Sequence, residues 1–217
     1  MRENMNYLNQ LIDRYQSLDA CKESIEQSYK ILIECFKNGN KLLVAGNGGS
    51  CADSEHIVGE LMKGFVLPRK CSAEFAEKLK KIDGTRGAEL ADKLQGGLPA
   101  IALTDHQGLN TAFINDVQNG GLLTYAQQVY GYGKEGDVFL GISTSGNSKN
   151  VMNAAVVAKA MGMKVLGLTG AKGGELASFA DVAIKVPETE TYKIQELHLP
   201  VYHCLCLMLE EEFFGNT

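Results

Sequence analysis

The sequence predicts an α/β protein, in which a five-stranded parallel sheet is flanked by helices and preceded by a helical segment. Short apolar runs at residues 41–45, 99–103, 137–142, 164–168 and 182–186 alternate with helix-like segments. This alternation is typical of a parallel sheet that is covered on both faces. The length of 217 residues and the 45% hydrophobic content fit one well-packed α/β domain rather than two independent ones.

The segment before the first strand, residues 3–37, is expected to be helical. Its apolar residues recur at three- and four-residue steps: Leu8, Leu11, Ile12, Tyr15, Leu18, Ile25, Tyr29, Leu32, Ile33 and Phe36. An apolar stripe of this width needs a partner surface. We therefore expect residues 1–38 to pack on the domain and on an oligomer interface, while residues 39–217 form the α/β domain.

A glycine-rich turn follows the first strand, at Gly46-Asn47-Gly48-Gly49-Ser50. A helix is expected to begin there and to run to about Met62. Glycines let a ligand approach the backbone closely, and the N-terminus of a helix offers unpaired N–H groups to an anion. An ordinary strand-to-helix turn has the same composition, so this turn alone leaves both interpretations open.

His56 and Glu60 lie four residues apart on the helix that follows this turn. This spacing puts both side chains on one face, within reach of one ion or one substrate. Such pairs are also common on solvated helix faces. Their position favours a functional role, because both residues follow the glycine turn by one to three helical turns.

Residues 66–97 interrupt the alternation with a segment rich in Lys and Glu. Its apolar residues recur at helical spacing, so we expect one or two helices that break near Asp83-Gly84 and form an insert before the second strand. The insert has five basic residues that could meet a phosphate: Arg69, Lys70, Lys80, Lys81 and Arg86. Charges on an exposed helix more often form a solvated face, which is the interpretation we adopt for them.

A hydroxyl-rich turn follows the third strand, at Ser143-Thr144-Ser145-Gly146-Asn147-Ser148. Ser148 by itself could cap the next helix, but one cap does not account for the other hydroxyls. We expect a phosphate seat here, on the same sheet edge as the glycine turn, because parallel strands end together. The sequence has neither GxxxxGK[ST] nor GxGxxG, which argues against a nucleoside-triphosphatase or a dinucleotide site.

Gln195 and His203 lie in the last helix-like segment, residues 191–214. Eight helical residues span about 12 Å, which is near the limit for two side chains that meet at one ion. The spacing therefore favours a site in which these two residues, His56 and Glu60 are pooled from more than one subunit. The remaining histidines, His106 and His198, are interpreted as structural or surface residues.

Composition excludes several classes of partner. The net charge of -5 argues against binding nucleic acid through a basic face. No run is long enough to span a membrane, and residues 1–7 lack the apolar core of a signal peptide. The six cysteines show no CxxC spacing, which favours reduced thiols. A cytoplasmic metabolic protein without nucleic-acid or membrane partners is expected.

From residue 41 onward, apart from the insert, the chain resembles the sugar isomerase (SIS) domain of the phosphoheptose isomerase family. The resemblance rests on AGNGGSCADSEHIVGEL, PAIALTD, FINDV, GDVFLGISTSGNSKNV, MKVLGLTG and IQELHLPVYH. It implies a flavodoxin-like three-layer sandwich, a homotetramer with shared sites, and an aldose–ketose isomerase that converts sedoheptulose 7-phosphate to D-glycero-D-manno-heptose 7-phosphate. The family usually has a short, Arg-containing link where this chain has Met62-Lys63-Gly64-Phe65 and the insert.

The resemblance also implies roles for individual residues. His56, Glu60, Gln195 and His203 match zinc ligands, and Glu60 and His203 match the acid/base pair that moves protons through an enediol. The implied substrate-binding residues are Asn47, Gly48, Gly49, Ser50, Glu60, Asn115, Asp116, Ser143, Thr144, Ser145, Ser148 and Gln195.

Two alternatives to this activity stay open. The first is a non-catalytic sugar-phosphate-binding or protein-interaction module, as in the related DnaA initiator-associating protein. That relative typically lacks the counterparts of Glu60 and His203, so their presence here favours the enzyme. The second alternative is an isomerase of another ketose phosphate, which the long insert makes reasonable.

Overall fold

The centre of the protein is a parallel sheet, and the computed structural model describes the chain over residues 4–215. Its strands are β1 (Leu42–Gly46), β2 (Ala100–Ala102), β3 (Val138–Ile142), β4 (Lys164–Thr169) and β5 (Val182–Lys185). They lie in the order β2-β1-β3-β4-β5 and are all parallel. The predicted sheet is confirmed, and each strand end lies within one residue of its expected position. Residues 1–3 and 216–217 of the two expected segments lie outside the described residues.

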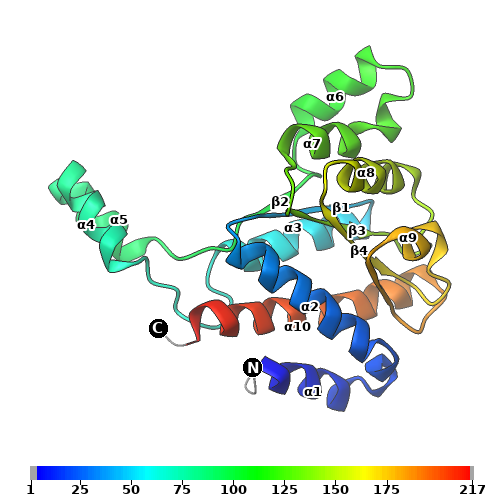
Figure 1. Ribbon diagram of the computed structural model, residues 1–217, viewed down its shortest axis with the longest axis horizontal. Coiled ribbons are helices and arrows are strands. Elements are labelled where there is room, and N and C mark those ends of the chain that lie inside the picture. Colours follow the sequence, from blue (N-terminus) through cyan, green and yellow to red (C-terminus); the bar gives the residue numbers. More distant parts are fainter. Residues whose placement is uncertain (1–3, 216–217) are drawn as a thin grey trace.

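Helices cover both faces of the sheet, as the continuous apolar strands predict. Leu42 and Val44 of β1 belong to one core, which they share with α2 (Lys22–Lys37), α3 (Gly49–Met62) and α10 (Thr191–Phe214). Leu43 and Ala45 belong to a second core on the opposite face, which includes α7 (Thr124–Tyr132), α8 (Lys149–Ala160) and α9 (Gly174–Phe179). Alternate residues of a strand point to opposite faces, so the expected three-layer sandwich is confirmed (Figure 1).

Of the N-terminal helices, α2 is part of the sandwich and α1 packs outside it. Helix α1 (Asn4–Arg14) is followed by a 3-10 helix, η1 (Gln16–Cys21), and then by α2. Figure 1 shows α1 alongside α10, and the two helices are in contact. Leu8 and Leu11 of α1 are buried in the core that α10 lines. Much of the apolar stripe of the N-terminal segment is thus covered by the same chain.

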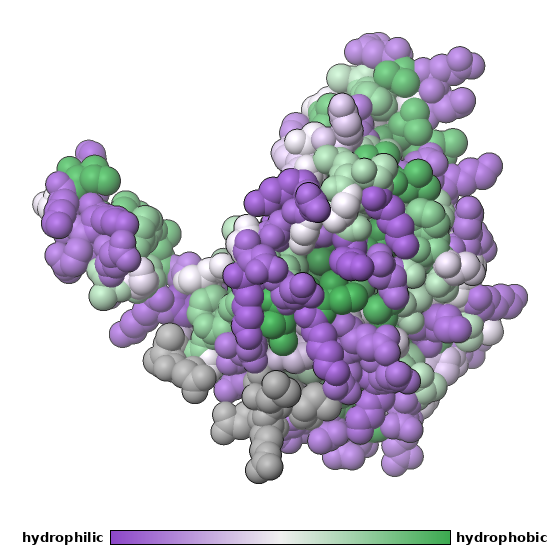
Figure 2. Space-filling view, viewed as in Figure 1, coloured by the Kyte–Doolittle hydropathy of each residue, from purple (hydrophilic) through white to green (hydrophobic). Residues whose placement is uncertain are grey.

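The insert forms two helices, α4 (Ala73–Ile82) and α5 (Gly84–Lys93), which pack on each other and extend away from the sandwich (Figure 1). Asp83 ends α4 and caps α5, since its side chain accepts hydrogen bonds from the N–H groups of Thr85 and Arg86. We call these two helices the arm. All of its residues are described; no residue of α4 is buried, and in α5 only Gly87 is buried. Figure 2 shows both hydrophobic and hydrophilic surface on the arm.

Two further elements complete the fold. Helix α6 (Gln107–Asp116) and the 3-10 helix η2 (Gly120–Leu122) connect β2 to α7, at the end of the molecule that lies farthest from α1 in Figure 1. In the described part of the chain, no helix combines the length and the apolar character that crossing a bilayer requires.

The register of the sheet places the two motif-bearing turns together. β1 and β3 are adjacent, and their last residues, Gly46 and Ile142, are paired. The glycine turn leaves β1 and the hydroxyl turn leaves β3, so both begin at the same level of the same sheet edge. This edge is where open α/β sheets bind ligands.

Candidate functional site

The glycine turn is in contact with the last helix. A Cβ atom added to Gly49 would come 2.5 Å from Nε2 of Gln195, so only glycine leaves room for Gln195 to lie against the turn. Asn47 forms two hydrogen bonds with Asn150 of α8, of 2.9 and 2.8 Å. The turn is therefore held by side chains from α8 and α10, which arrive from opposite sides of the sheet.

The hydroxyl turn is stabilised by its own side chains. The hydroxyl oxygens of Ser143 and Ser148 are 2.9 Å apart, and the N–H of Asn147 donates to Oγ of Ser145. Gly146 has a φ of 69°, and a Cβ there would overlap the Gly173 carbonyl. Within the described chain, Ser148 occupies the N-cap of α8 but makes no capping bond. The hydroxyls therefore serve the turn rather than the helix end.

The two turns share one cavity of about 370 Å³. Its lining includes Asn47, Gly48, Gly49, Ser50, Ser143, Thr144, Ser148 and Gln195. Ser145 faces a neighbouring cavity of about 270 Å³ that also contains Thr144 and Lys172. The described residues around the first cavity carry no charged side chain. An anion there would be bound by N–H groups and hydroxyls, which is how backbone nests and helix N-termini bind phosphate.

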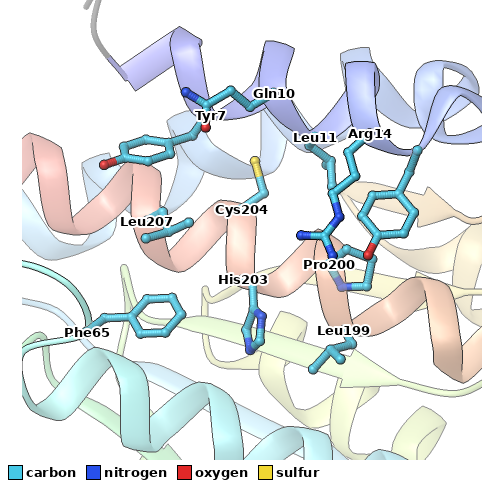
Figure 3. Close-up of a pocket in the computed structure, with 11 residues that line it drawn as sticks. Tyr7, Gln10, Leu11, Arg14, Phe65, Leu199, Pro200, His203, Cys204 and Leu207 are labelled. Carbon is cyan, nitrogen blue, oxygen red and sulfur yellow. The ribbon is translucent and has the colours of Figure 1, made fainter.

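His56, Glu60 and His203 come together within one chain. Nε2 of His56 lies 3.2 Å from Oε1 of Glu60, and the rings of His56 and His203 meet edge to face with centroids 4.9 Å apart. Figure 3 shows His203 pointing away from α1, with Phe65 beside it; the two rings are 5.4 Å apart. These three groups therefore meet without a second subunit, whereas pooling of all four groups from several subunits stays a prediction.

Gln195 occupies a different place on α10. It lies against Gly49 and lines the cavity between the two turns, whereas His203 lines a cavity of about 330 Å³ between α1 and α10 (Figure 3). Because of their long spacing on α10, Gln195 and His203 therefore line two different cavities.

A hydrogen-bond relay fixes the orientation of His56. The Tyr202 hydroxyl donates to Oδ1 of Asp53 at 3.2 Å and lies 2.9 Å from Nδ1 of His56. Because the hydroxyl proton goes to the carboxylate, the tautomer that this network assigns to His56 has its proton on Nδ1. A neutral His56 then presents the lone pair of Nε2 to the Glu60 carboxylate, and a proton or a metal cation is needed to stabilise two facing acceptors.

The surroundings of His203 favour its neutral form. Burial lowers the pKa of His203, and the neighbouring His56 lowers it further, against the opposing charge of Glu60. In the described structure, Nε2 of His203 is buried without a hydrogen-bond partner. Glu60 is shielded, with 12% of its side chain exposed, and its second oxygen pairs with Lys63 at 2.7 Å. The cluster of His56, Glu60 and His203 therefore combines an unpaired imidazole nitrogen with a nearly buried carboxylate.

The cluster has the donor types that zinc binds, namely imidazole nitrogen and carboxylate oxygen. Over residues 4–215, however, no three His, Cys, Asp or Glu side chains are arranged so that they could hold a metal ion. The facing atoms of His56 and Glu60 and the unpaired nitrogen of His203 fit a cation in chemical type, and binding one requires the side chains to move.

Two predicted substrate-binding residues lie elsewhere. Asn115 and Asp116 are exposed at the end of α6, where the Asn115 amide donates to the Asp116 carboxylate. Neither lines the cavity between the two turns. His106 is exposed, whereas His198 is fully buried.

Sequence reasoning missed several residues next to the cluster. Tyr202 and Asp53 orient His56, and neither stood out by spacing. Arg69, interpreted as part of a solvated face, is 1% exposed and pairs with the buried Glu210. The available signal was its place directly after an apolar stretch, Phe65-Val66-Leu67-Pro68, outside the two helices of the insert.

The comparisons with known proteins agree with this architecture. Residues 6–96 and 84–170 match the family described as SIS domain. The chain is 41% identical over 192 residues to the phosphoheptose isomerase of Aneurinibacillus thermoaerophilus, which covers 88% of this chain and 83% of the relative. It is 41% identical over 185 residues to phosphoheptose isomerase 2 of Campylobacter jejuni, covering 85% and 78%.

Solved structures show the same likeness. The phosphoheptose isomerase of Francisella tularensis superimposes with a TM-score of 0.71 at 30% identity, covering 97% of each chain. That of Neisseria gonorrhoeae gives a TM-score of 0.70 at 31% identity, covering 94% of this chain and 95% of the other.

Proposed function

Because the chain belongs to the phosphoheptose isomerase family of SIS-domain proteins, we propose that it converts sedoheptulose 7-phosphate to D-glycero-D-manno-heptose 7-phosphate. The observation that carries this proposal is the meeting of Glu60 with His56, and of His56 with His203, on the helices α3 and α10 that also line the cavity of the two turns. An acid/base pair and an anion seat are the two parts that isomerising a sugar phosphate requires.

The phosphate group would be bound at the sheet edge. Ser143, Thr144, Ser145 and Ser148 supply hydroxyls, and Asn47 to Ser50 supply the start of α3. We assign Gln195 to the sugar, because its side chain projects from α10 against Gly49 of the glycine turn and lines the cavity between the two turns. Lys172, which lines the neighbouring cavity, is the basic residue that we expect to add charge to the seat.

Glu60 and His203 would move the protons, one at each carbon. From the ketose, the base removes a proton from C1 and the electron pair forms the C1–C2 double bond as the C2 oxygen takes up a proton. C2 then gains a proton and the C1 hydroxyl loses its own, which yields the aldehyde. A carboxylate that is 12% exposed and a neutral imidazole suit these two roles, because a base is strengthened when water is excluded.

We further propose that zinc is the cofactor and that His56, Glu60, Gln195 and His203 hold it, which requires Gln195 to turn from its place against Gly49. When bound, the ion would supply stabilisation of negative charge on the sugar oxygens. His56 and His203 offer nitrogen lone pairs, and the relay through Tyr202 keeps that of His56 on Nε2. Glu60 would have to alternate between holding the ion and accepting the substrate proton. Zinc binding itself is measurable by calorimetry, apart from any activity.

We also propose a homotetramer that shares its sites and works in the cytoplasm. Asn115 and Asp116 are exposed and do not line the cavity of their own chain. If they contact the substrate, they would do so in the site of a neighbouring subunit. The arm carries apolar side chains that a monomer leaves in water, among them Ile82, which is 85% exposed. All six cysteines lie in the described residues and are free thiols, as is usual in a reducing compartment.

The test is proton NMR of sedoheptulose 7-phosphate in heavy water with zinc-supplemented protein. Aldose signals and deuterium at C2 are expected. Glu60→Gln keeps the shape of the side chain and should lower turnover by about 10²- to 10⁴-fold while the sugar still binds. Binding without exchange in the wild type would instead indicate a non-catalytic module. Turnover of another ketose phosphate in preference to this one would move the assignment to that sugar.

A further inference from the structure

A fully buried ion pair lies directly behind the reactive cluster. Nε of Arg69 is 2.7 Å from Oε1 of Glu210, and both side chains are 0% exposed. Arg69 belongs to the link between α3 and the arm, and Glu210 belongs to α10. Removing two charges from water is costly, and a buried pair is often no more stabilising than apolar side chains of the same volume. The stability of the fold therefore does not by itself account for these two residues.

The two terminal nitrogens of the Arg69 guanidinium donate to the end of α3. Nη2 donates to the Glu60 carbonyl at 3.0 Å, and Nη1 donates to the Leu61 carbonyl at 2.7 Å. α3 ends at Met62, and the last carbonyls of a helix have no partner within it. Arg69 supplies that partner at the residue that carries the reactive carboxylate, so it fixes the main chain from which the Glu60 side chain projects.

Glu210 holds the other side of the cluster. Its carboxylate accepts hydrogen bonds from three consecutive N–H groups, those of Phe65 at 2.7 Å, Val66 at 2.9 Å and Leu67 at 3.1 Å. These bonds shape the link so that the Phe65 ring packs against the ring of His203, as Figure 3 shows. Glu210 thus limits where the His203 imidazole can move.

We infer that Arg69 and Glu210 are positioning residues, whose ion pair sets the placement of Glu60 relative to His203. The inference rests on the proposed isomerase activity. Neither residue touches the substrate or exchanges a proton. Together they connect both members of the acid/base pair to one buried point, and displacing a catalytic group by about 1 Å can slow a reaction by about 10²-fold. Their loss should therefore lower kcat more than it changes KM.

The test compares four full-length proteins on sedoheptulose 7-phosphate: the wild type, Arg69→Lys, the double variant Arg69→Met/Glu210→Gln, and the control Lys41→Met/Asp137→Asn. The control removes a second ion pair whose carboxylate is 0% exposed. That pair precedes β1 and β3 and so lies at the sheet edge opposite the site. Circular dichroism gives the folded fraction, to which each kcat is referred.

We expect the double variant to lose about 10- to 100-fold in kcat, with KM close to the wild-type value. The kcat of Arg69→Lys should fall between those of the wild type and the double variant, because an ammonium keeps the charge but lacks the planar fork that reaches both carbonyls. The control should keep the wild-type kcat.

Three results would overturn the inference: a folded double variant with wild-type kcat, an equal loss in the control, or, where the double variant does not fold, an unchanged kcat in Arg69→Lys. An inactive wild type would refute the proposed function instead, whereas full activity in the variants refutes only the positioning role.

Discussion

The Tyr202 hydroxyl joins His56 to Asp53, with 2.9 Å to Nδ1 of His56 and 3.2 Å to the Asp53 carboxylate. Tyr202 is 2% exposed, so the hydroxyl at the centre of this relay is shielded from water, whereas His56 is exposed. Burial raises the pKa of Asp53, while the bond from Tyr202 opposes that rise. The relay directs the lone pair of His56 toward Glu60, and outer partners of this kind orient the imidazoles of metal sites.

Tyr202→Phe tests this relay. The change keeps the ring and removes both hydrogen bonds, so His56 can adopt either tautomer. We expect zinc affinity to fall by about 10- to 100-fold, measured by competition with a chromophoric chelator. The unfolding free energy should fall by about 1–3 kcal/mol, because the Asp53 carboxylate loses its partner. Tyr130→Phe, at a tyrosine that is 69% exposed, is the control, and equal zinc affinities in the two variants would contradict the relay.

The sheet and the two turns could be predicted because their causes are local. Strands that are buried on both faces must be continuously apolar, and the turns carry their own glycines and hydroxyls. His56 and Glu60 were accessible to the same reasoning, since helical spacing places them on one face. His203 was a candidate from the sequence as well, and the family resemblance gave it a role.

The rest of the cluster depends on contacts between distant parts of the chain. Arg69 was assigned to a solvated face because charged side chains usually are, yet its partner Glu210 lies 141 positions away. Likewise, Asp53 and Tyr202 are 149 positions apart, and no periodicity connects them. The rise between Gln195 and His203 suggested several subunits, whereas packing of α10 on α3 brings His203 to His56 within one chain.

Gly49→Ala tests the contact between the glycine turn and Gln195. The new methyl group would lie 2.5 Å from Nε2 of Gln195, and the flexible amide would move out of the cavity. We expect KM for the sugar phosphate to rise by about tenfold, the equivalent of about 1.4 kcal/mol, while the protein stays folded. Gly59→Ala on the exposed face of α3 meets nothing within 4 Å. This control should gain about 0.5–1 kcal/mol of stability with KM unchanged, and a similar KM in both variants would refute the role of the contact.

Ser148→Ala separates phosphate binding from helix capping. Within the described chain Ser148 makes no capping bond, so the melting temperature should change little. Loss of the hydroxyl that pairs with Ser143 should weaken binding of the sugar phosphate by roughly 5- to 10-fold, on the scale of one hydrogen bond of about 1 kcal/mol. Calorimetry with the sugar phosphate measures this, with Ser178→Ala on α9 as the control. A large loss of stability with unchanged affinity would mean that the hydroxyl serves the helix after all.

Ile82→Glu tests whether the arm meets another subunit. Ile82 is 85% exposed in the single chain, and burying such a side chain is worth about 1.5–3 kcal/mol. A charge there should shift sedimentation toward smaller species. Lys81→Glu, the neighbouring exposed position, changes charge without removing apolar surface and should keep the wild-type assembly. If both variants sediment like the wild type, the arm lies outside the interface.

Stability should depend on pH through His198, a histidine away from the proposed chemistry. Burial lowers the pKa of His198 to about 4, against a weak opposing interaction with the Thr169 backbone; among the described residues neither ring nitrogen has a hydrogen-bond partner of normal geometry. The unfolded chain titrates near pH 6.5 and so binds more protons than the folded one below that pH. The unfolding free energy should therefore fall as the pH drops from about 6.5 to 4, by on the order of 3 kcal/mol.

His198→Leu should flatten this part of the profile in urea titrations, whereas His106→Asn, at an exposed position, should keep it. Parallel profiles for wild type and His198→Leu would show that the buried imidazole is not the titrating group.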